Sequence, residues 1–226
     1  MVTFGTNYKI GTNDPIIKHD LGAGIWSSKK RTIKMITLKQ EILKILPVAY
    51  VAIGDDAAKH MFYYFSNRGD KYEIDLQGMV NEVTMAKDIY NNELDRVKKF
   101  VKKLPIGTHN ITTDTTIDGY NNEHENKNWY FAVGGYSAWI KGVARVEDGD
   151  NRAPRKYRLD YEYKIADRYN WDGGVGVGKK VEIYGVTITD KFMGEFHRQG
   201  LAKEFNMHGS IKGVIEWEYV LPRYRQ

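Results

Sequence analysis

The sequence predicts an α+β protein, in which a mainly helical segment precedes an antiparallel, half-open barrel-like β-sheet with one inserted helix. Apolar residues recur at helical spacing through the first half of the 226-residue chain, whereas residues 157–167 alternate strictly between apolar and charged side chains. The aromatic content of 13% is also typical of β-structure. We therefore expect an irregular arm or linker at residues 1–34, a helical subdomain at 35–107 and a β-rich subdomain at 108–226.

The first half contains three helical patterns. The arm is rich in Gly, Asn and Thr and has room for one short strand. From Thr37 apolar residues follow helical spacing, and Pro47 is expected to stop or kink that helix. A second helix is predicted from the acidic residues after Gly54 to the Asn/Gly-rich stretch at 67–69. Residues 78–104 predict one long amphipathic helix or two shorter ones.

The second half has the pattern of a sheet. Residues 129–146 predict two apolar strands on either side of a Gly-Gly pair. The alternation of residues 157–167 is a strong strand signal, and residues 181–188 are expected to continue the sheet. A helix is predicted to begin at Thr189–Asp190, and residues 209–221 return to strand.

Composition and charge exclude several classes of protein. The absence of cysteine excludes disulfides and a thiol nucleophile. No stretch reaches the roughly 18–20 apolar residues of a membrane span, and the N-terminus lacks the pattern of a cleaved signal peptide. Any export is therefore expected to be signal-independent, or the chain to be a fragment of a larger one. The net charge of +5 suits an anionic partner and equally an ordinary solvated surface.

Residues 173–179 match the phosphate-loop pattern G-x-x-x-x-G-K, but two features oppose a nucleotide site. Lys180 stands where the motif requires the Ser or Thr that binds magnesium. The following residues, VEIYGVTI, predict a strand rather than the helix whose first turn would hold the phosphate. We interpret this stretch as a glycine-rich connection between strands.

Polar residues cluster directly before that connection. Asp167, Tyr169, Asn170 and Asp172 lie where the alternating strand ends, a common location for catalytic residues. Turn formation is the simpler explanation of Asn170 and Asp172. Asp167 is different, because the alternation places it on the apolar face of the strand, where a carboxylate must be paired or border a cleft.

His197–Arg198 is the second candidate pair. It lies near the apolar stripe of the predicted helix, where a lone histidine is usually a hydrogen-bonded residue at the edge of the core. Together with the carboxylates upstream it also matches a phosphoryl-transfer set. Arginine binds phosphate, histidine moves a proton, and carboxylates hold a metal or polarise water. The other five histidines show no metal-binding spacing.

The order D-x-Y-N-W at residues 167–171, followed by H-R at 197–198, resembles the active-site signature of the colicin M family. The stretch AAKHMFYYFSNRGDKYEIDL is similar to a helical segment of that family. The resemblance implies a half-open barrel and a magnesium-dependent toxin that hydrolyses lipid II at the phosphodiester joining lipid to pyrophosphate. More loosely, DRYNWD with ITDKFMGEFHRQGLAKEF is similar to C-terminal toxin domains of polymorphic or type VI secretion effectors.

Carried over to this chain, the resemblance implies a role for each residue of the motif. Asp167 would be the main catalytic carboxylate, and Tyr169 and Asn170 would orient substrate or water. His197 would act as acid/base, and Arg198 would bind the pyrophosphate.

The resemblance also implies a metal and partners. Asn170 stands where the family has a second aspartate, so Asp167 and Asp172 are the expected Mg²⁺ ligands. The implied partners are a polyprenyl-pyrophosphate substrate such as lipid II at the membrane surface, a cognate immunity protein and a delivery module, with no nucleic acid. The implied site of action is the periplasm of a target cell.

Two alternatives remain open at this point. Basic residues interleaved with aromatic ones would also suit a toxin nuclease that acts in the cytoplasm. A non-catalytic glycan-binding or accessory module is the third hypothesis.

Overall fold

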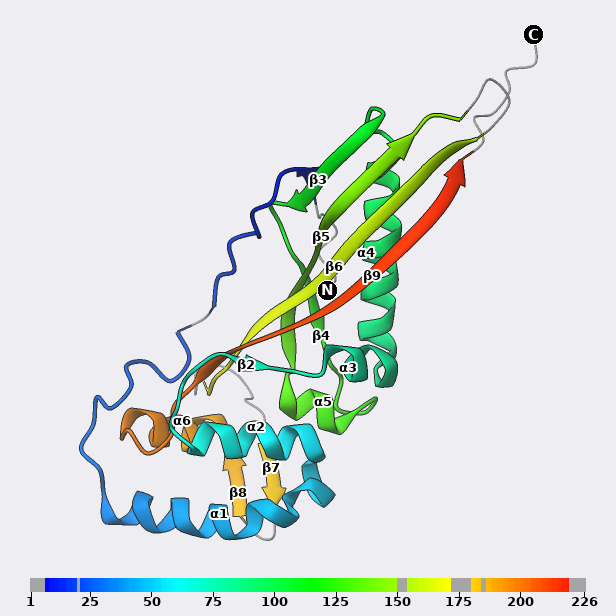
Figure 1. Ribbon diagram of the computed structural model, residues 1–226. Helices are drawn as coiled ribbons and strands as arrows, with labels where there is room; N and C mark the ends of the chain where they lie inside the picture. Colours follow the sequence, from blue (N-terminus) through cyan, green and yellow to red (C-terminus); the bar gives the residue numbers. More distant parts are fainter. Residues whose placement is uncertain (1–6, 20, 150–153, 172–179, 184–185, 220–226) are drawn as a thin grey trace.

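A computed structural model describes residues 7–19, 21–149, 154–171, 180–183 and 186–219. Figure 1 shows an elongated molecule in which long strands run from a helix-rich end to a narrow tip, with one helix along the sheet. The described residues form an open, mostly antiparallel sheet of seven strands together with six helices, so the predicted α+β class is confirmed. Among the described helices, none is long and apolar enough to cross a bilayer.

The helices are α1 (Ile33–Ile53), α2 (Asp55–Phe65), α3 (Leu76–Glu82), α4 (Thr84–Val101), α5 (Lys127–Ala132) and α6 (Asp190–Arg198). The region 78–104 therefore forms two helices, one of the two predicted outcomes. Helix α1 begins where the Thr32 side chain accepts a hydrogen bond from the Met35 amide. It does not stop at Pro47, because Leu46 and Ala49 on either side of the proline stay buried on one continuous face.

The sheet consists of β1 (Tyr8–Ile10), β2 (Tyr72–Glu73), β3 (Gly107–Thr113), β4 (Ile117–Tyr120), β5 (Gly135–Glu147), β6 (Arg155–Tyr169) and β9 (Phe205–Tyr219). Its order is β1-β3-β5-β6-β9-β2, and β4 also pairs with β5. Every pairing is antiparallel except that of β2 with β9. Strands β6 and β9 confirm the strands predicted at 157–167 and 209–221.

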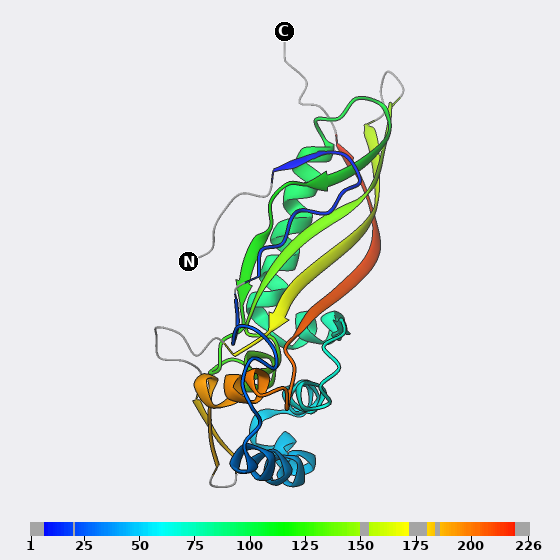
Figure 2. The same ribbon diagram turned by 90° about the vertical axis from the view of Figure 1, so that its left-hand side faces the viewer.

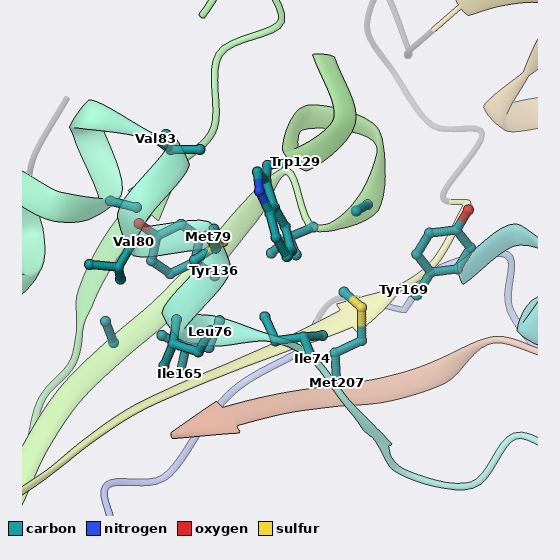
Figure 3. Packing of buried hydrophobic residues seen from close by; sticks show 14 of the residues in the cluster. Ile74, Leu76, Met79, Val80, Val83, Trp129, Tyr136, Ile165, Tyr169 and Met207 are labelled. Carbon is teal, nitrogen blue, oxygen red and sulfur yellow. The ribbon is translucent and has the colours of Figure 1, made fainter. Parts of the chain in front are cut away.

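The alternation of β6 separates two faces of the sheet. Tyr163 is buried and packs edge-on against Tyr90 of α4, with ring centroids 5.0 Å apart. Lys164 points the other way, and its Nζ lies 2.7 Å from a carboxylate oxygen of Asp14 in the arm. One hydrophobic core joins the helices to the sheet, and Figure 3 shows Leu76, Met79 and Trp129 packed near the core residues of β6 and β9. The predicted helical and β-rich subdomains thus share a core.

The first of the two strands predicted in 129–146 is wrong, and the strands at 181–188 form but belong to a separate sheet. Residues 127–132 form helix α5, because the Asn126 side chain caps its first turn and Gly134 ends it with φ +69°. Strands β7 (Lys180–Ile183) and β8 (Val186–Thr189) pair with each other and do not join the seven-stranded sheet. The helix predicted at Thr189–Asp190 is confirmed as α6, with the Thr189 hydroxyl accepting from the Phe192 amide. The glycine-rich connection at 173–179 lies outside the described residues.

Candidate active site

The end of β6 carries Asp167 and Asn170 to a pocket. Asp167 lies between Ile165 and Tyr169 on the buried face of β6, yet it is itself only half-buried. Tyr169 is held in the core by stacking on Phe205, with ring centroids 5.0 Å apart. Because the strand ends here, its last carboxylate borders solvent while its aromatic neighbour anchors the backbone.

The pocket has a volume of about 310 Å³ and lies where β6, α5 and α6 meet. Asp167, Asn170 and Asp190 supply its polar wall, and Phe131 and Trp171 supply part of its apolar wall. Asp190 is the first residue of α6. The pocket therefore brings together two carboxylates from elements that are separate in the sequence.

A second pocket of about 320 Å³ also includes Asp167, Arg168 and Asn170 in its lining. Its wall adds His19 from the arm and Asp118 from β4. Basic and acidic side chains thus both line the pockets at the end of β6. Such a mixed wall suits an anionic substrate that must be both bound and attacked by water.

Arg168 is a pocket residue that the sequence analysis missed. Arg168 lines both pockets, and its Nη2 lies 3.4 Å from Oε2 of Glu204. Its Nη1 lies 3.4 Å from the side-chain oxygen of Asn206. The alternation of β6 assigned Arg168 to the solvent face, so only its position inside the D-R-Y-N-W stretch could have drawn attention to it.

Glu204 is the second residue that the sequence analysis missed. It is buried, and its Oε1 accepts hydrogen bonds from the amides of Ala23 at 2.8 Å and Trp171 at 2.9 Å. A buried carboxylate is tolerated when hydrogen-bond donors and a cation satisfy it, and here Arg168 is the cation. Glu204 therefore ties the arm and the D-R-Y-N-W stretch to the start of β9.

His197 lies behind this network, with only 2% of its surface exposed. Its Nδ1 accepts from the Glu204 amide at 3.1 Å, so the neutral ring donates from Nε2 to the carbonyl of Gly24, also at 3.1 Å. Burial lowers the pKa of His197, which favours this neutral form. Both nitrogens hold the arm and the turn before β9 in place.

Arg198 makes similar structural contacts. Its Nε donates to Glu195 at 3.0 Å and its Nη1 to the carbonyl of Ala23 at 3.2 Å. Among the described residues that line the two pockets, neither His197 nor Arg198 occurs. The structure therefore brings Asp167, Tyr169 and Asn170 to one pocket and places the H-R pair in the packing of the arm. The roles implied for His197 and Arg198 stay predictions.

The implied Mg²⁺ is compatible with the donors at this pocket. Asp172 lies outside the described residues, so its expected role as a ligand stays a prediction. Within the described ranges, no group of three or more His, Asp or Glu side chains is placed to hold a metal together. Mg²⁺ is commonly bound by one or two carboxylates plus water and substrate phosphate oxygens. Asp167 and Asp190 fit that requirement as hard oxygen donors bordering one pocket.

Two solved structures are similar to this chain. PaeM, a colicin M-like bacteriocin produced by Pseudomonas aeruginosa, matches at 12% identity over 74% of this chain and 53% of that chain, with a TM-score of 0.38. Truncated syringacin M from Pseudomonas syringae pv. tomato DC3000 matches at 10% identity over 72% of this chain and 60% of that chain, with a TM-score of 0.32. No family model matches the chain, and no curated protein does. At these values the likeness carries no evidence of activity for this chain.

Proposed function

We propose that this protein is an antibacterial toxin hydrolase that cleaves the phosphodiester joining lipid to pyrophosphate in lipid II, which blocks peptidoglycan synthesis. The observation that carries the proposal is the position of Asp167, which borders one pocket with Asp190 and Arg168 at the end of β6. Hydrolysis of a phosphodiester needs a group that accepts a proton from water and positive charge that stabilises the phosphoryl oxygens. This pocket contains both.

In the proposed reaction Asp167 accepts the proton of the attacking water, and the Asn170 amide orients that water. The Arg168 guanidinium binds the pyrophosphate oxygens, which suits its planar arrangement of donors. Mg²⁺, held by Asp167 and Asp190 when bound, supplies further positive charge to the pyrophosphate. His19, from the adjoining pocket wall, protonates the departing lipid alcohol.

In this proposal His197 and Arg198 position the site rather than touch the substrate. They hold the backbone of Ala23 and Gly24, and His197 also holds the amide of Glu204. His197→Gln should then raise KM or lower kcat through loosened packing, without removing an ionisation from the pH–rate profile. A catalytic His197 would instead contribute a pKa to that profile that the variant lacks.

The experiment is hydrolysis of purified lipid II, with and without Mg²⁺, followed by separation of the polyprenol from the pyrophosphorylated disaccharide-peptide. Asp167→Asn should abolish both products. Asp160→Asn is the matched control, because Asp160 lies on the same strand and pairs with Arg145 and Arg158 outside the pocket. Intact lipid II under every condition, at protein concentrations that inhibit growth, would refute the proposal.

The location of action follows from the same proposal. The protein acts in the target periplasm, to which a delivery module carries it, and a cognate immunity protein protects the producer. Expression directed to the periplasm should therefore stop growth, whereas cytoplasmic expression should not. Killing from the cytoplasm with RNA or DNA degradation would favour the nuclease. Growth inhibition that survives Asp167→Asn would favour the non-catalytic module.

A further inference from the structure

The outward face of α1 and the arm that leads into it expose apolar side chains. Helix α1 buries Met35, Ile42, Leu46, Ala49 and Ile53 against the core. On the opposite side Ile33 is 84% exposed and Val51 is 71% exposed, and in the arm Leu21 and Ile25 are 89% and 79% exposed. A surface helix usually carries polar residues on its outer face, so apolar groups on both faces indicate that something covers this one.

This surface lies at one end of the molecule and has a fixed shape. In Figures 1 and 2, α1 lies at the end opposite the narrow tip, and the arm runs down to its first turn. The arm is bonded to the protein, because the amides of Ser27 and Lys29 donate to the carbonyls of His197 and Arg198 at 3.1 and 2.8 Å. The Trp26 indole also donates to the Ala202 carbonyl at 3.2 Å. The exposed side chains of the arm are therefore carried by a segment that is hydrogen-bonded to the rest of the protein.

The charge of the same surface is positive. Between residues 21 and 51 the sequence contains one acid, the exposed Glu41, against six basic residues: Lys29, Lys30, Arg31, Lys34, Lys39 and Lys44. Lys30, Lys34 and, ten residues further along α1, Lys44 are exposed. Lys29 pairs with Glu195, and Lys39 donates to the carbonyls of Phe65 and Leu201. These two lysines therefore make contacts within the protein. The exposed lysines stand among the exposed apolar residues.

We propose that this face, formed by the exposed residues of 21–36 and the outer side of α1 to Val51, docks on the surface of an anionic phospholipid bilayer. An apolar helical face flanked by lysines is the composition of interfacial helices, which bury the apolar groups at the headgroup boundary and pair the cations with acidic lipids. A second copy of this chain is disfavoured as the occupant, because face-to-face contact would bring like charges together at Lys30, Lys34 and Lys44.

Helix α1 lies between the proposed docking face and the aromatic residues of the pocket. Ile53, the last residue of α1, lines a small apolar cavity with Phe131, Tyr169 and Trp171. The same three aromatic residues form part of the wall of the 310 Å³ pocket. The buried face of α1, opposite the docking face, thus contacts an aromatic cluster that also lines the pocket. The docking itself rests on the surface alone and does not require that the pocket hydrolyses lipid II.

The test is co-sedimentation of the purified protein with vesicles that contain no lipid-linked pyrophosphate, so that its outcome is separate from any hydrolysis. The wild type should bind phosphatidylglycerol/phosphatidylcholine vesicles. Binding should weaken as the salt concentration rises, because salt screens the attraction between the lysines and the anionic headgroups. The double variant Ile33→Ser/Val51→Ser should bind about 100-fold more weakly, since each of the two apolar side chains withdrawn from water contributes roughly a factor of ten. Lys30→Gln/Lys34→Gln should weaken binding to anionic vesicles and remove most of its salt dependence.

The matched control is Ile106→Ser/Val214→Ser, which removes two exposed apolar side chains, 52% and 50% exposed, elsewhere on the molecule. It should bind vesicles like the wild type. Isoleucine and serine have similar helix propensities, so Ile33→Ser should leave thermal unfolding unchanged, and circular dichroism verifies this. The proposal would be overturned if the wild-type protein did not bind anionic vesicles. It would also be overturned if both double variants weakened vesicle binding equally. So would a concentration-dependent dimer that Ile33→Ser/Val51→Ser disrupts.

Discussion

Removal of the Glu204 carboxylate should loosen the arm and the pocket together. Glu204→Ala leaves the buried amides of Ala23 and Trp171 without their acceptor and the partly exposed Arg168 without its carboxylate partner. Each buried donor left unsatisfied costs about 1–3 kcal/mol, and loss of the ion pair adds less than the roughly 3–5 kcal/mol of a fully buried pair, because water reaches Arg168. These costs overlap because they share one side chain. We expect the free energy of unfolding to fall by about 3–5 kcal/mol.

That loss is large against the roughly 5–15 kcal/mol that stabilises an ordinary domain. For a chain of this size it corresponds to a melting temperature lower by roughly 6–20 °C. Urea unfolding at neutral pH measures the free energy. Hydrogen exchange locates the effect, because the amides of Ala23 and Trp171 should exchange faster while those in the centre of β6 change least.

The control for Glu204→Ala is Glu216→Gln. Glu216 is an exposed carboxylate that pairs with Arg158, so its loss should cost at most about 1 kcal/mol. A stability of Glu204→Ala within about 0.5 kcal/mol of the wild type, the range of ordinary surface substitutions, would refute the reasoning. Unchanged exchange at Ala23 and Trp171 would refute it as well, even if the global stability fell.

Three further predictions concern pH, backbone and charge. Burial lowers the pKa of His197 and His60 below the ordinary value of 6.5, so the unfolded chain binds protons that the folded protein does not, and stability should fall as pH drops through about 6.5. His197→Gln should reduce that fall in urea titrations between neutral and mildly acidic pH, and an identical pH dependence would contradict the burial argument. Gly54→Ala should lower the free energy of unfolding by about 2–3 kcal/mol, because φ of +96° strains any other residue and the new Cβ would clash with the Asn128 side chain. Melting curves measure this loss, and an unchanged melting temperature would exclude the strain. Arg168→Met should slow lipid II hydrolysis roughly 100-fold, with Arg168→Lys recovering part of the rate, and a normal rate in Arg168→Met would remove this arginine from phosphate binding.

Local pattern was enough to predict some elements and not others. The alternation of residues 157–167 and the Thr189 cap are local signals, and β6 and α6 appear where they predict. Residues 129–134 are a short apolar run, which fits a strand or a buried helix equally well, and the Asn126 cap decided for α5. The stretch 181–188 was correctly read as extended, but its strands pair with each other instead of joining the sheet. Which strands pair depends on segments distant in the sequence, and a local pattern cannot identify them.

For the candidate site the division is similar. The sequence by itself determined that Asp167 falls on the buried face at the end of a strand, because side chains alternate with a period of two whatever the surrounding fold. Only the tertiary structure decided what lies around it. Glu204 accepts hydrogen bonds from Ala23, which is 181 positions away in the sequence, and from Trp171, which is 33 positions away. His197 is hydrogen-bonded to Gly24 and does not line the pocket. Contacts over such separations depend on how helices and strands pack, and that packing placed Arg168 and Asp190 beside Asp167.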